Sequence, residues 1–468
     1  MNSRNRRSAP ARLAAALRSH FHFRPSEQWA VARYLVRWLV LLTPVAAAVG
    51  TACAFFLWAL EKVTDARFDH PWLLYLLPLA GLASAAMYHR FGRSVEGGNN
   101  LIVEEIHEPG GGVPPRIVPL VFIGTVGAHL FGASVGREGT AVQMGGGIAS
   151  ACNRVFRLRD HELRTLLMAG VAAGFGAVFG TPIAGAVFAM EVVTIGRMEY
   201  GALIPVLYSA LLADFTTAAW DVHHTAYHVA VTVPDCRLPF DAGLMAKVAL
   251  AGAAFGLAAV LFAELAHGIG RVFRRLVASP LLRPAIGGAI LVAVTLALGT
   301  REYLGLGVTS PNPGDVTIVS SFVGGGADNF SWWWKLALTA LCVGSGFKGG
   351  EVTPLFFIGA TLGNRLAALL RAPVDLFAGL GFVAVFAGAA NTPLACTVMG
   401  IELFGAGNAP YIAVACFTAY LVSGHSGIYP SQRVGTGKVP ARAATENVAL
   451  RDVRGAADVS SSTEVLER

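Results

Sequence analysis

The sequence predicts an all-α membrane protein that crosses the bilayer many times. Of its 468 residues, 54% are hydrophobic and only 14% are charged, a composition too apolar for a soluble globular protein. Many of its apolar runs are shorter than the roughly 20 residues that a simple span needs, or are interrupted by glycine and proline. Broken helices are tolerated in a bilayer where they line a polar cavity, so the pattern favours a transporter or a channel. The runs are Leu39 to Leu60, Trp72 to Met87, Leu166 to Met190, Ala202 to Leu212, Val248 to Leu261, Ile286 to Leu298, Leu336 to Val343, Leu376 to Ala390 and Ile412 to Val422.

The two ends of the chain are polar and indicate how it is oriented. The first 37 residues carry eight arginines against the single acid Glu27, so the positive-inside rule predicts a cytoplasmic N-terminus. The apolar stretch there is too short and too flanked by arginine for a cleaved signal peptide. The net charge of +7 is attributed to orientation and lipid contact, because no basic patch with interleaved aromatic residues indicates nucleic-acid binding. From Ser431 the chain turns polar again, and we expect a largely disordered cytoplasmic end.

An internal repeat divides the chain between these ends. The stretch from Gly180 to Gly185, followed by Glu191, recurs from Asn391 to Cys396, followed by Glu402, at an offset of 211 residues. At the same offset Arg137 falls on Lys348. Repeats of this kind are typical of transporters whose substrate lies between the halves, and an odd number of spans per half would invert one half relative to the other. The predicted boundaries are 1–30 for an Arg-rich segment, 31–215 for the first repeat, 216–240 for a connecting loop, 241–430 for the second repeat and 431–468 for the tail.

Glu138 is the first candidate functional residue. It lies in Gly136-Arg137-Glu138-Gly139-Thr140, inside a run that otherwise reads as membrane-embedded. Charged side chains at membrane depth are costly and usually face an ion path. The flanking glycines offer backbone N–H groups at a helix start, where an anion can bind. Glu191 and Glu402, by contrast, are expected to cap helices or form structural pairs.

Two other patterns suggest different chemistry. The stretch Gly132 to Gly136 matches the G-x-S-x-G turn of serine hydrolases around Ser134, with His129 nearby, so an intramembrane hydrolase is a remote alternative. No strand is predicted before it, and its small residues suit close helix packing. The histidines 223, 224 and 228 beside Asp221 have metal-ligand spacing, but they fall in the connecting loop, where a surface cluster is favoured. Neither a metal nor a cofactor is predicted.

Four segments resemble the CLC family of chloride channels and anion/proton antiporters. Gly97-Gly98-Asn99-Asn100 matches the first anion-binding loop of that family, and Gly136 to Thr140 matches its GREGP motif. Gly350-Glu351-Val352-Thr353-Pro354 matches the GxFxP motif, and Tyr429 follows the last span as the pore tyrosine of the family does. The resemblance implies a CLC-type fold of two inverted repeats of broken helices.

Departures from the family pattern resemble the fluoride-exporting branch. Chloride members have serine at the position of Gly98, proline at Thr140 and phenylalanine at Val352. The resemblance implies that Glu138 is the gating, proton-carrying glutamate. It also implies an ion path formed by Gly98, Asn99, Asn100, Val352, Thr353 and Tyr429. Some members of the branch have methionine where this chain has Gly98, and Asn99 has the alternative of capping the helix that follows it.

The resemblance implies a fluoride/proton antiporter, forming a homodimer in the inner membrane of a bacterium. Fluoride is strongly hydrated, so a selective path must replace its water with strong donors, and amide and hydroxyl groups suit that task. The alternative is a chloride/proton antiporter or chloride channel of the same fold. Chloride antiporters have a second proton-carrying glutamate where this chain has Val192, so the inner proton route has no assigned residue.

Overall fold

The computed structural model describes residues 25–230, 241–438 and 448–453. The chain forms two compact units, one ending at Leu41 and one beginning at Leu42. The α-helices are α2 (Pro25–Asp69), α3 (Leu77–Met87), α4 (Asn99–His107), α5 (Ile117–Leu130), α6 (Glu138–Phe156), α7 (Asp160–Phe179), α8 (Pro182–Glu191), α9 (Leu203–Ala219), α10 (Ala242–Leu276), α11 (Leu282–Leu298), α12 (Ser331–Ser345), α13 (Val352–Leu370), α14 (Val374–Ala390), α15 (Pro393–Phe404) and α16 (Ala409–Val422). Short 3₁₀ or π turns are η1 (Pro71–Leu76), η2 (Tyr88–Gly92), η3 (Arg93–Val95), η4 (Tyr200–Ala202), η5 (Ser320–Phe322) and η6 (Ala406–Asn408). The strands are β1 (Thr194–Ile195), β2 (Arg433–Val434) and β3 (Val448–Ala449).

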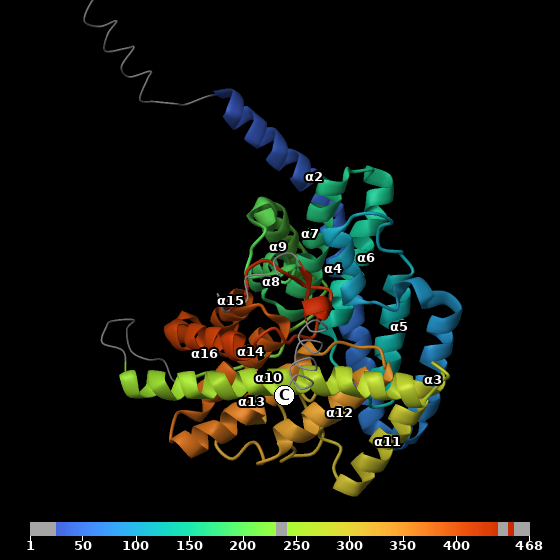
Figure 1. Cartoon of the computed structure of the whole chain (residues 1–468), viewed down its shortest axis with the longest axis vertical. Helices are drawn as coiled ribbons and strands as arrows, with labels where there is room; N and C mark the ends of the chain where they lie inside the picture. Colours follow the sequence, from blue (N-terminus) through green and yellow to red (C-terminus); the bar gives the residue numbers. More distant parts are fainter. Residues whose placement is uncertain (1–24, 231–240, 439–447, 454–468) are drawn as a thin grey trace, which may run out of the picture. The chain divides into compact units, whose positions relative to one another are not determined.

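The helices are the broken, apolar helices that the sequence predicts. In the described part of the chain, six helical segments are long and apolar enough to cross a membrane. Between them lie shorter apolar helices such as α8, α14 and α15. Figure 1 shows the long helix α10 beside α12, α14 and α16, against which it packs. The fold is therefore an all-α membrane architecture, to which the described residues add one small three-stranded sheet.

The two repeats differ in the length of one helix, which corrects the predicted register. Helices α6 and α13 both have 19 residues, and both end at an arginine in the left-handed conformation, Arg157 and Arg371. These helices match at an offset of 214. Helix α14 has 17 residues where α7 has 20, so the offset falls to 211 from the following turn onward. The expected match of Arg137 with Lys348 is wrong for this reason, and Arg137 corresponds to Glu351.

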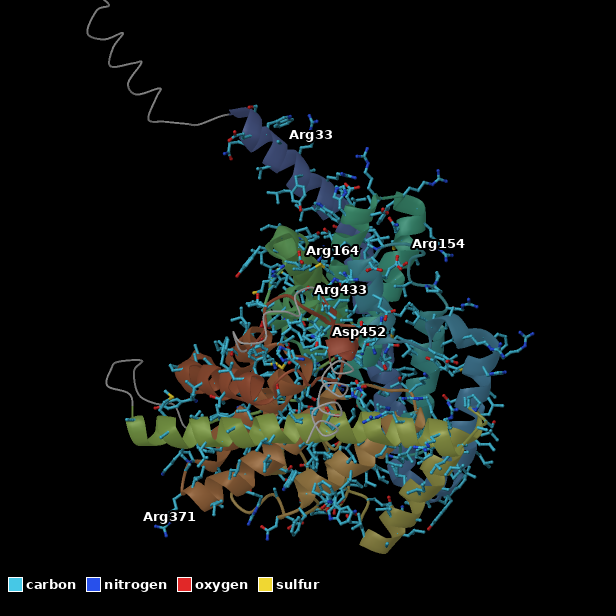
Figure 2. The ribbon with its side chains drawn as sticks, viewed as in Figure 1. Arg33, Arg154, Arg164, Arg371, Arg433 and Asp452 are labelled. Atoms are coloured by element: carbon cyan, nitrogen blue, oxygen red, sulfur yellow. The ribbon has the colours of Figure 1, made fainter. Side chains whose placement is uncertain are left out.

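Helices α6 and α13 begin next to each other and extend in opposite directions. Gly136 and Gly350 exchange two backbone hydrogen bonds there, with N to O distances of 2.5 and 2.8 Å. Figure 2 shows Arg154, near the end of α6, and Arg371, directly after α13, at opposite ends of the second unit. Equivalent helices thus run in opposite directions from a common start, as expected for inverted repeats.

Close contacts between helices repeat in the same way. A Cβ at Gly145 of α6 would lie 2.0 Å from the carbonyl oxygen of Gly170 in α7. In the second repeat, a Cβ at Gly359 of α13 would lie 1.9 Å from the carbonyl oxygen of Gly381 in α14. Only glycine permits such an approach, so these glycines serve helix packing in the membrane.

A glutamate from each repeat caps a helix of the other repeat. The Glu191 carboxylate accepts hydrogen bonds from the backbone amides of Leu394 (3.1 Å) and Ala395 (2.8 Å), in the first turn of α15. The Glu402 carboxylate accepts from the amides of Ile183 (3.0 Å) and Ala184 (2.7 Å), in the first turn of α8. Helix starts offer unpaired amides and a favourable dipole for an anion. The structural role expected for both glutamates is confirmed.

The described part of the segment that follows α16 is packed, and the expectation of a largely disordered end falls mostly on residues outside the described part of the chain. Gln432 is fully buried, and its side-chain amide donates to the carbonyl oxygens of Val192 and Ala390, both at 2.8 Å. Strand β2 pairs in parallel with β1 and antiparallel with β3. Residues 439–447 and 454–468, like residues 1–24 of the Arg-rich segment, lie outside the described residues.

Candidate functional site

The Glu138 side chain is buried at the start of α13. It is 1% exposed, and one of its carboxylate oxygens accepts hydrogen bonds from the backbone amides of Thr353 (3.0 Å) and Arg137 (3.1 Å). The other oxygen accepts from the Thr353 hydroxyl and lies 3.4 Å from Nε of Arg137. Every one of these partners is a donor, so all of these contacts suit a carboxylate as the acceptor.

This arrangement is an anion site occupied by a side chain. Thr353 is the second residue of α13, where backbone amides are unpaired and the helix dipole favours negative charge. A free anion and the Glu138 carboxylate would use the same amide and the same hydroxyl. Val352 and Thr353 are both buried, 2% and 3% exposed, and Thr353 contacts Glu138 directly.

A cavity of about 430 Å³ brings the other predicted residues together, and we call it the loop cavity. Its lining includes Gly98, Asn99, Asn100 and Tyr429. The first three residues lie at the start of α4, and Tyr429 follows α16. The structure thus places four of the six predicted ion-path residues around one cavity, whereas Val352 and Thr353 do not line it.

The backbone at Gly98 requires glycine. Its φ angle is +55°, a conformation that side chains with a Cβ rarely adopt, and a Cβ there would lie 3.2 Å from the side-chain nitrogen of Gln143. This geometry gives a physical reason for glycine at a position where other members of the fluoride-exporting branch have methionine.

The two asparagines make different contacts. The Asn100 carbonyl oxygen Oδ1 accepts from the backbone amide of Ser431 at 3.2 Å, which ties the loop cavity to the packed C-terminal segment. Asn99 makes no side-chain cap at the start of α4, so the alternative of a capping role is wrong. Its amide nitrogen instead lies 3.0 Å from where a Cβ of Gly139 would be, against the start of α6. Within the described residues, Oδ1 of Asn99 is buried without a hydrogen-bond partner.

Sequence reasoning did not place Glu351 or Lys348 at the site, although both line the loop cavity. Glu351 directly precedes Val352 and stands inside the matched motif, so an ionisable residue in an apolar segment was the signal that could have identified it. The Lys348 ammonium lies 4.2 Å from the ring centroid of Tyr88. The offset of 211 residues paired Lys348 with Arg137, so the repeat gave no indication that Lys348 lines the loop cavity.

The remaining patterns do not form catalytic or metal sites. Ser134 is fully buried, and its hydroxyl donates to the carbonyl oxygen of Tyr303 (2.9 Å) and pairs with the Thr339 hydroxyl (2.9 Å). His129 Nδ1 instead forms a hydrogen bond with the Thr125 carbonyl oxygen at 2.9 Å. His129 is therefore not bonded to the Ser134 hydroxyl as a general base would be. In the described part of the chain, no group of three or more His, Cys, Asp or Glu side chains is placed to hold a metal ion.

The fold and the site define a membrane protein with two inverted repeats and a helix start that holds the Glu138 carboxylate. The chain belongs to the voltage-gated chloride channel family, whose model matches residues 80–424. It is 50% identical over 438 residues to a chloride/fluoride channel protein of Pseudomonas syringae pv. tomato, covering 92% of this chain and 94% of that protein. It is 29% identical over 401 residues to an H(+)/Cl(-) exchange transporter of Vibrio vulnificus, covering 78% and 81% of the two chains.

Solved structures give the same assignment of the fold. The crystal structure of a CLC-type fluoride/proton antiporter superposes with a TM-score of 0.80 at 34% sequence identity, covering 86% of this chain and 98% of that one. A slow cyanobacterial Cl-/H+ antiporter superposes with a TM-score of 0.67 at 20% identity, covering 83% and 94% of the two chains, which shows the fold alone.

Proposed function

We propose that this chain is a fluoride/proton antiporter that exports fluoride from the cytoplasm. The observation that carries the proposal is the Glu138 carboxylate, which occupies an anion site formed by the amide and hydroxyl of Thr353. The relatives named for fluoride transport support the choice of ion. Transport rather than hydrolysis also agrees with the inert surroundings of Ser134.

Competition for this site would couple the two ions. The ionised carboxylate holds the Thr353 donors and excludes other anions. A protonated Glu138 has lost its charge, so it releases the site and fluoride takes its place. Fluoride from the cytoplasm leaves on the outer side, and the protonated carboxyl group, which took its proton from that side, returns to the site and releases the proton toward the cytoplasm. One cycle therefore moves a proton inward and fluoride outward.

The polar groups around the path suit fluoride. Fluoride is a strong hydrogen-bond acceptor, and short contacts with amide and hydroxyl donors replace its water best. Thr353, Asn100 and Tyr429 carry such donors. We assign the ion path to these residues together with Gly98, Asn99 and Val352.

Glu351 is our candidate for the inner proton route, which Val192 cannot provide. It lines the loop cavity and stands two residues before Thr353. A carboxyl group there can take a proton from Glu138 and pass it to cavity water.

The positive charge near the N-terminus indicates how the chain is oriented in the membrane. The arginine-rich N-terminus favours the cytoplasm, so α2 would end outside and the loop cavity would face the cytoplasm. We propose a homodimer in a bacterial inner membrane, built from a first repeat at 31–215, a connection at 216–240 and a second repeat at 241–430. The predicted Arg-rich segment at 1–30 and the tail at 431–468 flank these repeats, and membrane lipid is an expected partner of the chain.

The test is flux from proteoliposomes loaded with fluoride or chloride, read by ion-selective electrodes while external pH is recorded. Wild type should release fluoride and take up protons in a fixed ratio, and Glu138→Gln should lose that coupling. Matched reconstitution of Glu108→Gln, at an exposed carboxylate, controls for the loss of a carboxylate elsewhere. Equal chloride and fluoride flux would assign the chain to chloride exchange instead, and the absence of any anion flux would contradict transport altogether.

A further inference from the structure

The connection that follows α9 lies against Glu138. Its residues His224, Thr225 and Tyr227 line a cavity of about 20 Å³ together with Glu138 and Thr353. By the measure used for buried water, this volume holds about one water molecule. We call it the gate cavity.

The connection is held firmly in this position. The Tyr227 ring centroid lies 5.0 Å from that of Phe382 and 5.7 Å from that of Phe322. A few residues further on, the backbone amide of Ala230 donates to the Asp375 carboxylate at 2.7 Å. The side chains that this segment presents to Glu138 are therefore fixed features of the site.

A second and larger cavity reaches the same residues. It has a volume of about 850 Å³, and its lining includes the second half of α2 and residues 220–225. We call it the wide cavity, and in the proposed orientation it faces outside. Arg137, His224, Thr225 and Val308 line both cavities. Among these four, only His224 carries a group that accepts a proton at one atom and donates from another near neutral pH.

The orientation of His224 differs from that of its neighbours. His223 and His228 are exposed, whereas His224 is half-buried between the two cavities. Its ring packs on Gly180, where a Cβ would lie 2.6 Å from ring carbon Cδ2. Within the described residues, neither ring nitrogen of His224 has a hydrogen-bond partner. Both are free to bond to water.

Burial and nearby positive charge keep the His224 imidazole neutral. Burial, together with the charges of Arg137 and His223, lowers the pKa of His224 to about 4. A neutral imidazole has one donor and one acceptor nitrogen, as a relay needs. The titratable or charged groups that line the two cavities with it are Glu61 and Asp65 of α2, Arg137 before α6, Glu138 of α6, and Asp221, His223 and Tyr227 of the connection.

We propose that His224 relays protons from the wide cavity to Glu138. One ring nitrogen takes a proton from water in the wide cavity. The other ring nitrogen gives its proton to the single water of the gate cavity, which passes a proton to the Glu138 carboxylate. One proton has then moved from the wide cavity to Glu138. The imidazole now carries its proton on the other ring nitrogen, and it returns to the starting tautomer before the next transfer. The acids Glu61 and Asp65 raise the local proton concentration at the entrance. This inference rests on the proposed antiport.

The test compares His224→Ala with wild type in strongly buffered proteoliposomes, reading initial fluoride efflux and proton uptake. Loss of a relay should slow both fluxes by roughly 100-fold, with their ratio unchanged. Imidazole added to the buffer should restore much of the rate, because a small imidazole can fill the vacated space. His223→Ala and His228→Ala, on exposed residues of the same connection, should behave as wild type.

Two results would overturn the relay. Wild-type rates in His224→Ala would mean that water reaches Glu138 without this residue. A slow His224→Ala that imidazole does not rescue, but that His224→Phe restores, would assign His224 to packing alone. Failure of the antiport itself is distinguishable, since wild type would then show no proton-coupled fluoride flux under the same conditions.

Discussion

Glu138 of the first repeat bonds to both the backbone amide and the hydroxyl of Thr353 in the second repeat. The site is therefore shared between the halves of the molecule, at the point where α6 and α13 begin. Any motion that separates these two helix starts would break the site. In the proposed antiport, the contact between the repeats would therefore control transport.

Removal of the Thr353 hydroxyl should weaken anion binding. A hydrogen bond to a charged group contributes about 1.5–3 kcal/mol, so Thr353→Val should weaken fluoride binding by roughly 10- to 100-fold. Thr353→Ser keeps the hydroxyl and should bind nearly as wild type does. Isothermal titration calorimetry of fluoride into the purified protein measures the affinity of both variants. Equal affinities for the valine and serine variants would show that the backbone amide alone holds the anion.

Neutralising Glu351 should affect protons more than fluoride. Glu351→Gln keeps the shape of the side chain but cannot carry a proton, so coupled proton uptake should fall by roughly 100-fold while fluoride affinity stays the same. Glu96→Gln is the matched control, because Glu96 lines the same cavity. Flux and titration on the same preparations separate the two effects. A Glu351→Gln protein with normal proton uptake would require another inner route.

Loss of either capping glutamate should destabilise the protein equally. Glu191→Ala and Glu402→Ala each leave two backbone amides at a helix start without their acceptor, at a cost of about 2–4 kcal/mol in the free energy of unfolding. Thermal unfolding in detergent compares the variants, and the exposed Glu108→Ala serves as the control. A marked difference between the two glutamate variants would argue against a symmetric role, and a loss of proton coupling without a loss of stability would argue for relays.

Much of the architecture could be predicted from the sequence. Membrane spans, broken helices and the repeat all follow from apolar runs and a recurring Thr-Pro turn. The register could not, because glycine- and alanine-rich helices look alike and nothing in α14 marks the three residues that it lacks relative to α7. Polar residues of the tail gave no sign that Gln432 is buried, since its partners are carbonyl oxygens from distant turns.

The candidate site was predicted in part. Glu138 was identified because a carboxylate in an apolar run needs a reason, and motif matches supplied its neighbours. Glu351 is likewise a carboxylate in an apolar segment. It stands at a variable position of its motif, so the motif match alone does not identify it. The inward orientation of His224 is beyond sequence reasoning, since three nearby histidines in a loop give no sign of which one faces the core.

The reciprocal caps of Glu191 and Glu402 have a consequence for synthesis on the ribosome. Helix α8 leaves the ribosome with its first-turn amides unpaired, and its acceptor Glu402 is translated more than 200 residues later. At 5–20 residues per second the delay is roughly 10–40 s. During that time the nascent first half lies in the bilayer as an incomplete structure, which makes it a substrate for insertion chaperones and membrane proteases until the second half arrives.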